Sequence, residues 1–389
     1  MKTEAQLTPR DLTKASLVRF VAYFLKLGTF GFGGPIALAG HMQQDLVDAY
    51  GWVSREDYLE GLALAQLAPG PLAAQLAIYL GYLQAGVLGA TLVAIAFVLP
   101  SFLMVLALSA AYVRYGGLSW MQGMFYGVGA AVIAIIARSA YKLTKLTLGK
   151  DWLLWTIFVV LAVSTAWTSR ESILLVLLCG IAMLVAKAFP RDALSRGKLR
   201  MHASLFLAAL TLPATGVIGE IFFYFAKAGL LVFGSGLAII PFLYGGVVQG
   251  HHWITDRQFV DAVAVAMITP GPVLITVAFI GYLVAGLTGA TAAALGVFFP
   301  VYLIVLLLAP SYKRWAKNPQ INAFMRGVTA AATGAIAGSV VILARRSIYD
   351  WPTILVALVS LAVLMKWKVP EPMLIAVAAV AGMALRRGV

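Results

Sequence analysis

Two long stretches without a charged residue, each interrupted by the tripeptide Pro-Gly-Pro, constrain the fold of this chain more than any other feature. No Asp, Glu, Lys or Arg occurs at positions 61–113 or 262–312, and a helix needs only ~20 residues to cross a bilayer. Neither Pro69-Gly70-Pro71 nor Pro270-Gly271-Pro272 can continue a helix, because proline lacks a donor and its ring collides with the preceding turn. Inside a membrane such breaks are tolerated where the freed backbone is buried in protein or faces a polar cavity. We therefore expect broken helices at the functional core of a membrane protein.

The composition of the chain agrees with a membrane location. Hydrophobic residues make up 62% of the chain and charged residues 11%, whereas about a quarter of a soluble domain is charged. The net charge of +14 comes mostly from Lys and Arg between apolar segments, which indicates cytoplasmic loops rather than a nucleic-acid-binding surface. The single cysteine, Cys179, lies in an apolar segment, where it has no partner for a disulfide or a metal site. We predict an all-α polytopic membrane protein without a metal or cofactor.

An internal repeat divides the chain into two homologous halves. Seven residues of the first half recur 201 positions later. They are Tyr23, Phe24, Lys26, Gly28, Phe32, Gly33 and Trp52, and their counterparts are Tyr224, Phe225, Lys227, Gly229, Phe233, Gly234 and Trp253. The Pro-Gly-Pro tripeptides keep this offset, and Pro100 recurs at an offset of 200 as Pro300. We predict an N-terminal repeat at 12–189, a basic linker with a short apolar segment at 190–215, and a C-terminal repeat at 216–385.

The positions of the basic loops predict that the two halves face opposite sides of the membrane. Short cytoplasmic loops collect Lys and Arg. Three lysines at 142–150 follow the fourth apolar segment of the first half, whereas three basic residues at 313–317 follow the third segment of the second half. Inversion requires an odd number of crossings before the second half. The chain has 13 crossings if residues 203–217 form an extra helix, or ten if the Pro-Gly-Pro segments are re-entrant hairpins, and the sequence leaves both open.

Inverted repeats with discontinuous helices are typical of secondary transporters, whose substrate site lies near the midplane between the repeats. The half-helices that begin at Leu72 and Val273 should present free N–H groups and partial positive charge to an anion. The predicted anion site includes both Pro-Gly-Pro tripeptides and the side chains beside them: Pro69, Gly70, Pro71, Gln75, Pro270, Gly271, Pro272 and Thr276. The glycine-rich break at Gly33 and Gly34 is part of the same prediction. The alternatives are kinks that serve packing alone, and hydrogen bonds between helices for Gln75 and Thr276.

Two lysines at equivalent positions, Lys26 and Lys227, are the most informative charges. They precede Gly28 and Gly229, where we expect the first helix of each half to break. A lysine inside a membrane costs several kcal/mol unless it snorkels to the interface or meets a partner. We predict that both lysines attract an oxyanion. Helical spacing places Lys26 on one face with Arg19 and Tyr23, and Lys227 on one face with Glu220 and Tyr224.

Three carboxylates are candidates for coupling transport to protons. Glu220 shares a helix face with Lys227, and Glu60 and Asp261 occupy equivalent positions beside the two uncharged stretches. For Glu60 and Asp261, the position at the edge of these stretches favours the alternative that each is simply solvated at the membrane interface. His41 lacks metal-ligand spacing and is interpreted as a loop residue. Because no nucleotide motif occurs, we expect an ion gradient or the gradient of the substrate to drive transport.

Several motifs together resemble the chromate ion transporter family, in its long-chain, two-domain form. These are Phe32-Gly33-Gly34-Pro35, His41, Trp52 and Pro69-Gly70-Pro71 with Gln75 and Gly81-Tyr82, and in the second half Phe233-Gly234-Ser235-Gly236, Trp253 and Pro270-Gly271-Pro272. The resemblance covers nearly the whole chain. The second half departs from the pattern, because Ser235 and Ile239-Ile240 replace the Gly34-Pro35 motif.

The resemblance implies a function and a set of partners. A protein of this family would export chromate from the cytoplasm across the inner (plasma) membrane, as an antiporter driven by the proton motive force, and so confer chromate resistance. Its partners would be chromate, the related anion sulfate, protons and membrane lipid, and its oligomeric state stays open. The alternatives are a transporter of sulfate or another oxyanion and a passive anion channel. A membrane enzyme would need convergent acids, histidines or metal ligands, which are sparse here, and a sensor would need a soluble output domain.

Overall fold

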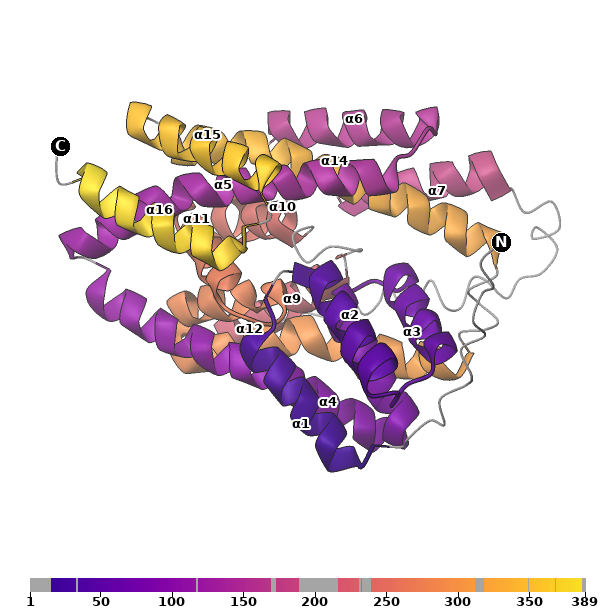
Figure 1. Cartoon of the computed structure of the whole chain (residues 1–389). Coiled ribbons are helices and arrows are strands. Elements are labelled where there is room, and N and C mark those ends of the chain that lie inside the picture. The colour runs from indigo at the N-terminus through magenta and orange to yellow at the C-terminus, as the bar shows by residue number, and fades with distance from the viewer. Residues whose placement is uncertain are drawn as a thin grey trace, which may run out of the picture.

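The computed structural model describes residues 15–32, 34–116, 118–168, 173–188, 216–230, 232, 239–311, 318–348, 350–367 and 369–386. The predicted linker at 190–215 and Gly33 lie outside these residues, as does the extra helix predicted at 203–217 except for Gly216 and Val217, which begin the next helix. Every regular element in the described ranges is a helix, as the sequence predicts (Figure 1).

The helices of the two halves follow one another in the same order. The first half contains α1 (Leu17–Phe30), α2 (Gly34–Met42), the π-helical η1 (Gln43–Ala49), α3 (Arg55–Leu67), α4 (Leu72–Tyr115), α5 (Ser119–Thr147), α6 (Trp152–Thr168) and α7 (Ile173–Ala188). The second half contains α9 (Gly216–Leu230), α10 (Ile239–Leu243), η5 (Tyr244–Gly250), α11 (Asp256–Ile268), η6 (Val273–Ile275), α12 (Thr276–Leu308), η7 (Ala309–Ser311), α14 (Pro319–Ser347), α15 (Trp351–Lys366) and α16 (Glu371–Arg386). This correspondence confirms the internal repeat.

Each Pro-Gly-Pro tripeptide lies at the tip of a helical hairpin. Ser54 caps α3 by accepting a hydrogen bond from the Asp57 N–H, and α3 ends just before the first tripeptide. The chain then reverses, as the hydrogen bond from Tyr79 on α4 to Glu60 on α3 (3.4 Å) shows. The two arms therefore lie side by side and antiparallel, which is the geometry of the re-entrant alternative.

Both long helices that follow contain a second sharp break. In α4 the break lies at Ala85 and Gly86, and Gly86 has a φ of +59°. The backbones of Gly81 and Gly89 are in direct contact across it, since a Cβ on either glycine would overlap the other's carbonyl oxygen. In α12 the same break lies at Ala285 and Gly286. Each helix is therefore a short arm folded against a long one.

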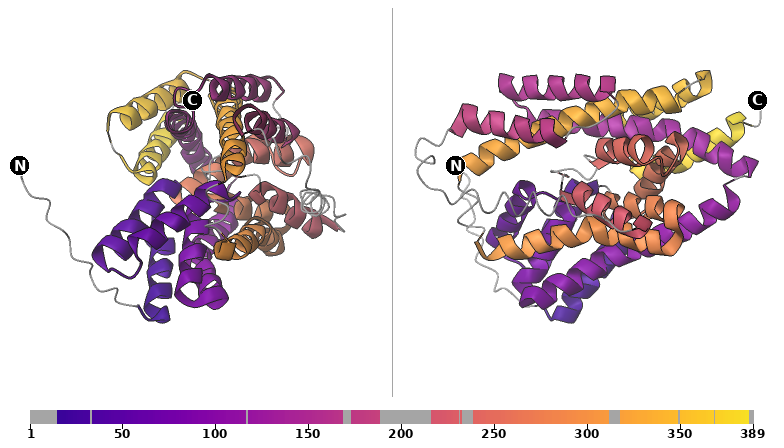
Figure 2. Two further views of the ribbon diagram at one scale, coloured as in Figure 1. Left: turned by 90° about the vertical axis from the view of Figure 1, so that its right-hand side faces the viewer. Right: turned by 180° about the vertical axis from the view of Figure 1, so that it is seen from behind.

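Each half packs its longest upper helix against helices of the other half. Helix α5 of the first half packs against α15 and α16 of the second, and α14 of the second half packs against α6 and α7 of the first. Figure 1 shows these six helices in an upper layer, above a lower layer that contains α1, α4, α9 and α12. The equivalent helices α5 and α14 run in opposite directions in both side views (Figures 1 and 2). Opposite directions of equivalent helices are what inverted halves would give, and the inversion itself stays a prediction.

Length and surface confirm the membrane class. Four helical segments in the described part are long and apolar enough to cross a bilayer: Leu72–Tyr115, Ser119–Thr147, Val273–Leu308 and Pro319–Ser347. The shorter helices α6 and α15 have exposed tryptophans at both ends: Trp152 and Trp167 on α6, Trp351 at the start of α15 and Trp367 directly after its last residue. Tryptophans at both ends of a helix are typical of the two membrane–water interfaces.

The first helix of each half does not break where the sequence predicts. Helix α1 continues through Gly28 to Phe30, and α9 continues through Gly229 to Leu230. A Cβ at Gly28 would overlap the Phe97 carbonyl oxygen of α4. Gly28 is therefore needed for the close packing of α1 on α4, and the break follows at Gly31.

Candidate functional site

Two equivalent hydrogen bonds join the halves. The Gly70 N–H donates to the Val232 carbonyl (2.6 Å), and the Gly271 N–H donates to the Gly31 carbonyl (2.8 Å). Both members of the first bond lie 201 positions from their counterparts in the second. Each Pro-Gly-Pro tip is therefore fastened to the end of the first helix in the other half.

Ser101 on α4 reinforces this crossing. Its hydroxyl donates to the Pro270 carbonyl (2.8 Å) and lies 3.3 Å from the Gly28 carbonyl oxygen. Gly271 has a φ of +96°, which favours glycine, and a Cβ there would overlap the Ser101 hydroxyl oxygen. Only glycine fits at this tip without a shift of its neighbours.

The predicted anion-binding residues of the tripeptides are closed off in this conformation. Gly70, Pro71, Pro270, Gly271 and Pro272 are buried, and Pro69 is half-buried. Gln75 is fully buried and donates to the Pro69 carbonyl (2.7 Å), while the Thr276 hydroxyl donates to the Val273 carbonyl (2.8 Å). These side chains bond within their own motifs, so a direct contact with an anion stays a prediction. Gly34 begins α2 and is half-buried.

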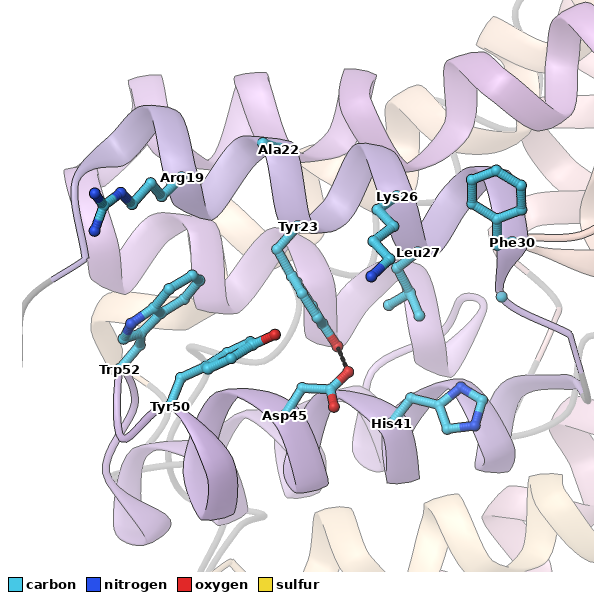
Figure 3. A pocket seen from close by; sticks show the side chains of 11 residues that line it. Arg19, Ala22, Tyr23, Lys26, Leu27, Phe30, His41, Asp45, Tyr50 and Trp52 are labelled. Carbon is cyan, nitrogen blue, oxygen red and sulfur yellow. Dashed lines mark hydrogen bonds between the residues drawn. The ribbon is translucent and has the colours of Figure 1, made fainter.

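A cleft of about 470 Å³ lies between α1 and the α2–η1 segment. Figure 3 shows Arg19, Tyr23 and Lys26 on one wall, facing His41 and Asp45 on the other. We call this space the first-half cleft. The two walls are joined by a hydrogen bond from the Tyr23 hydroxyl to Asp45 Oδ2 (3.0 Å), which makes α1 and η1 the arms of a further hairpin. The volume of the first-half cleft is in the range of small-molecule sites.

The first-half cleft is suited to an anion. It contains two cations, Arg19 and Lys26, against the single carboxylate of Asp45. Within the described ranges neither cation forms an ion pair. Both side chains are exposed, so they are accessible to a ligand. Gly31, which accepts the hydrogen bond from Gly271, also lines the cleft, so the anion-binding space adjoins the crossing of the halves.

The prediction for His41 was wrong. His41 lies in the last turn of α2 and lines the first-half cleft, so it is not a loop residue. The pairing of Tyr23 with Asp45 was also missed. Helical spacing places Tyr23 on one face with Arg19 and Lys26, but it does not show which residue of another segment faces that tyrosine.

A second, smaller cleft of about 120 Å³ lies between α5, α11 and α14. Asp261 lies at its inner wall with only 3% of its surface exposed. Tyr112 of α4 donates a hydrogen bond to Asp261 Oδ2 (2.8 Å), so this pair also joins the two halves. Arg346 and Asp256 form an ion pair (2.7 Å) in the same cleft.

Because Asp261 is buried, solvation at the interface is the wrong interpretation of this residue. The other two coupling candidates, Glu60 and Glu220, lie in different surroundings. Glu60 is half-buried and accepts the hydrogen bond from Tyr79. Glu220 lies exposed on α9, and Lys227 is half-buried on the same helix. The structure therefore does not bring Lys227 and Glu220 into the first-half cleft.

Broken helices, hairpin tips at the boundary between two repeats and an accessible cationic cleft define the class of this protein as a polytopic membrane protein built like a secondary transporter. The family model of chromate transporters matches residues 18–184 and 219–383, one region in each half. The chain belongs to the chromate transporter family.

Individual relatives extend over nearly the whole chain. The chromate transport protein of Cupriavidus metallidurans is 60% identical over 373 residues, which cover 95% of this chain and 93% of the relative. The probable chromate transport protein of Synechococcus elongatus is 55% identical over 94% of this chain and 95% of the relative. The chromate transport protein of Pseudomonas aeruginosa is 32% identical over 91% of this chain and 88% of the relative. No solved structure matches the chain significantly.

Proposed function

We propose that this protein exports chromate from the cytoplasm across the inner membrane, as an antiporter driven by the proton motive force. The observation that carries the proposal is the position of the cationic first-half cleft, whose lining residue Gly31 accepts the hydrogen bond from the Pro-Gly-Pro tip of the other half. The names of the close relatives support chromate as the substrate.

The first-half cleft favours a dianion over a neutral or cationic ligand. Arg19 and Lys26 can donate charge-assisted hydrogen bonds to the oxygens of chromate. Tyr23 holds the Asp45 carboxylate by a hydrogen bond, which reduces its repulsion of an incoming anion. Sulfate is a tetrahedral dianion of similar size, so this cleft alone discriminates weakly between the two. We therefore expect sulfate to compete with chromate.

In this proposal the crossing opens and closes during transport. Breaking the bonds of Gly70 and Gly271 to the other half would free both hairpin tips, and with them the N-terminal N–H groups of the helices that follow. The freed groups would then face the anion as it leaves the first-half cleft. Bistable contacts between packed repeats are a general way for small shifts to become an alternating-access change.

Among the three candidate carboxylates, Asp261 is best placed to carry the coupling proton. It is buried, it is bonded to Tyr112 of the other half, and it lies on a cleft that also contains charged residues. A carboxylate in such surroundings gains most from neutralisation by a proton. Protonation would also change its bond to Tyr112, so the charge of Asp261 acts on the boundary between the halves.

Chromate flux into inverted membrane vesicles tests the proposal. With an imposed gradient that makes the vesicle interior acidic, we expect chromate to accumulate inside, and an uncoupler should abolish the accumulation. Excess sulfate should reduce the uptake. Flux that is insensitive to the uncoupler and only follows the chromate gradient would show a passive channel instead, and the absence of chromate flux would overturn the assignment.

A further inference from the structure

Among the described residues, the second-half positions equivalent to the first-half cleft differ from it in charge and in side-chain contacts. We propose that each chain binds one transported anion, in the first-half cleft, and that the equivalent region of the second half is a closed structural copy. This inference rests on the proposed function, because it concerns where that anion binds.

Equivalent positions in the two halves carry different charges. Arg19 of the first-half cleft corresponds to Glu220, so one of its two cations is replaced by an anion. Lys26 and Lys227 are the same, and Asp45 is replaced by Gly246. The first half thus has two cations against one carboxylate, whereas the second half has one of each. Only the first set retains a positive charge for attracting a dianion.

Aromatic rings fill the equivalent space in the second half. The Tyr224 ring stacks on Phe242, with ring centroids 5.3 Å apart and planes at 15°. Its hydroxyl donates to the Phe242 main-chain carbonyl (2.9 Å). In the first half the equivalent tyrosine, Tyr23, reaches across to Asp45 instead, and the polar His41 stands at the position of Phe242.

Gly246 shows how closely Tyr224 approaches the opposite wall. A Cβ at Gly246 would overlap the Tyr224 hydroxyl oxygen. The tyrosine therefore occupies the place that the side chain of Asp45 takes in the first half. Tyr224 also packs edge-on against His251 (5.4 Å) and Trp253 (5.6 Å), which stack on each other at 4.3 Å. The stack of His251 on Trp253 has a counterpart in Tyr50 and Trp52 of the first half, so the contacts that differ between the halves are those of Tyr224 with Phe242 and Gly246.

This difference gives the halves different roles in one cycle. The first half holds the substrate beside the crossing, between Lys26 and Gly31. The second half supplies the Gly271 tip that bonds to Gly31 and the buried Asp261. A repeat origin therefore does not require two substrate sites.

The two lysines provide a matched test, because they are the same residue at equivalent positions. In calorimetric titrations of the purified full-length protein with potassium chromate, we expect one bound chromate per chain. Lys26→Ala should weaken binding by about tenfold or more, as expected for loss of a charge-assisted hydrogen bond, and Lys26→Arg should restore most of the affinity. Lys227→Ala should change the affinity less than about twofold.

A charge-reversal pair repeats the test with other side chains. Arg19→Glu gives the first half the charge of the second and should abolish measurable binding, whereas Glu220→Arg should leave it unchanged. Elution volume and melting temperature confirm that each variant is folded. Two bound chromates per chain, or equal losses from Lys26→Ala and Lys227→Ala, would overturn the inference while leaving chromate transport intact. If the unmodified protein neither binds nor transports chromate, the proposed function fails as well.

Discussion

At the scale of single residues, a charged side chain inside or beside an apolar segment is the clearest candidate for a functional residue. A charged side chain that is buried away from water needs a partner or a proton. Asp261 has both a partner, Tyr112, and a cleft beside it. The groups that face this site from the packed elements are Tyr112 of α4, Tyr126 of α5, Asp256 and Arg257 of α11, and Arg346 of α14. Asp261 is the most enclosed carboxylate among them, and for this reason we propose that its protonation carries the coupling.

Replacing Asp261 by asparagine should therefore remove proton coupling and spare downhill transport. Asparagine keeps the shape and still accepts the hydrogen bond from Tyr112, but it cannot take up a proton. In proteoliposomes we expect Asp261→Asn to exchange chromate down its own gradient while losing its response to an imposed pH difference. Glu60→Gln serves as the matched control at the equivalent position and should keep that response. An unchanged response in Asp261→Asn would remove this residue from coupling.

The sequence predicts isolated charges well and their partners poorly. Lys26 and Asp261 stand out because each interrupts or borders an apolar segment. Asp45 and Tyr112 do not stand out, since their importance comes from partners that are 22 and 149 positions away. Such pairs depend on how the hairpins and the halves pack, which no local pattern records.

At the scale of elements, the hairpin tips are held by a few close backbone contacts. Proline and glycine content alone predicts that the helices end at the tripeptides. The reversal of the chain at each tip and the bond to the opposite half depend on tertiary packing, and the sequence left the hairpin as one of two alternatives. Ser101 illustrates this limit, because its contact with Pro270 joins residues 169 positions apart.

Gly271→Ala should destabilise the protein more than a glycine substitution with open surroundings. The added Cβ would both strain a positive φ and overlap Ser101, and we expect a loss of about 3 kcal/mol from the two effects together. Gly286→Ala also strains its backbone (φ +59°, ψ −146°) but has open space around it, so only the strain, about 1–2 kcal/mol, is expected there. The melting temperature of each purified variant, with unfolding monitored by tryptophan fluorescence, measures the difference.

A second substitution separates the overlap from the backbone strain. Ser101→Ala removes the hydroxyl that the new Cβ would meet, so it should recover part of the melting temperature lost by Gly271→Ala. Sites in contact show such coupling, whereas distant sites add independently. Additive losses in the double variant would show that the tip does not press on Ser101.

At the scale of the whole molecule, the account depends on how the two halves are oriented. The sequence repeat predicts the halves, and the basic loops predict that they are inverted. The exchange of α5 and α14 between the halves was not predicted, because it depends on which helices pack together and not on any one segment. The structure shows α5 and α14 running in opposite directions (Figure 2), and the tryptophans at both ends of α6 and α15 support a membrane normal along these helices.

The orientation of the equivalent helix ends tests this central claim most directly. Lys145 near the end of α5 and Arg345 near the end of α14 are exposed and occupy equivalent positions. Each can be changed to cysteine in a Cys179→Ser background and exposed to a membrane-impermeant maleimide, in intact spheroplasts and in inverted vesicles. Inversion predicts that one cysteine reacts only in spheroplasts and the other only in inverted vesicles. Reaction of both from the same side would show parallel halves and contradict the account.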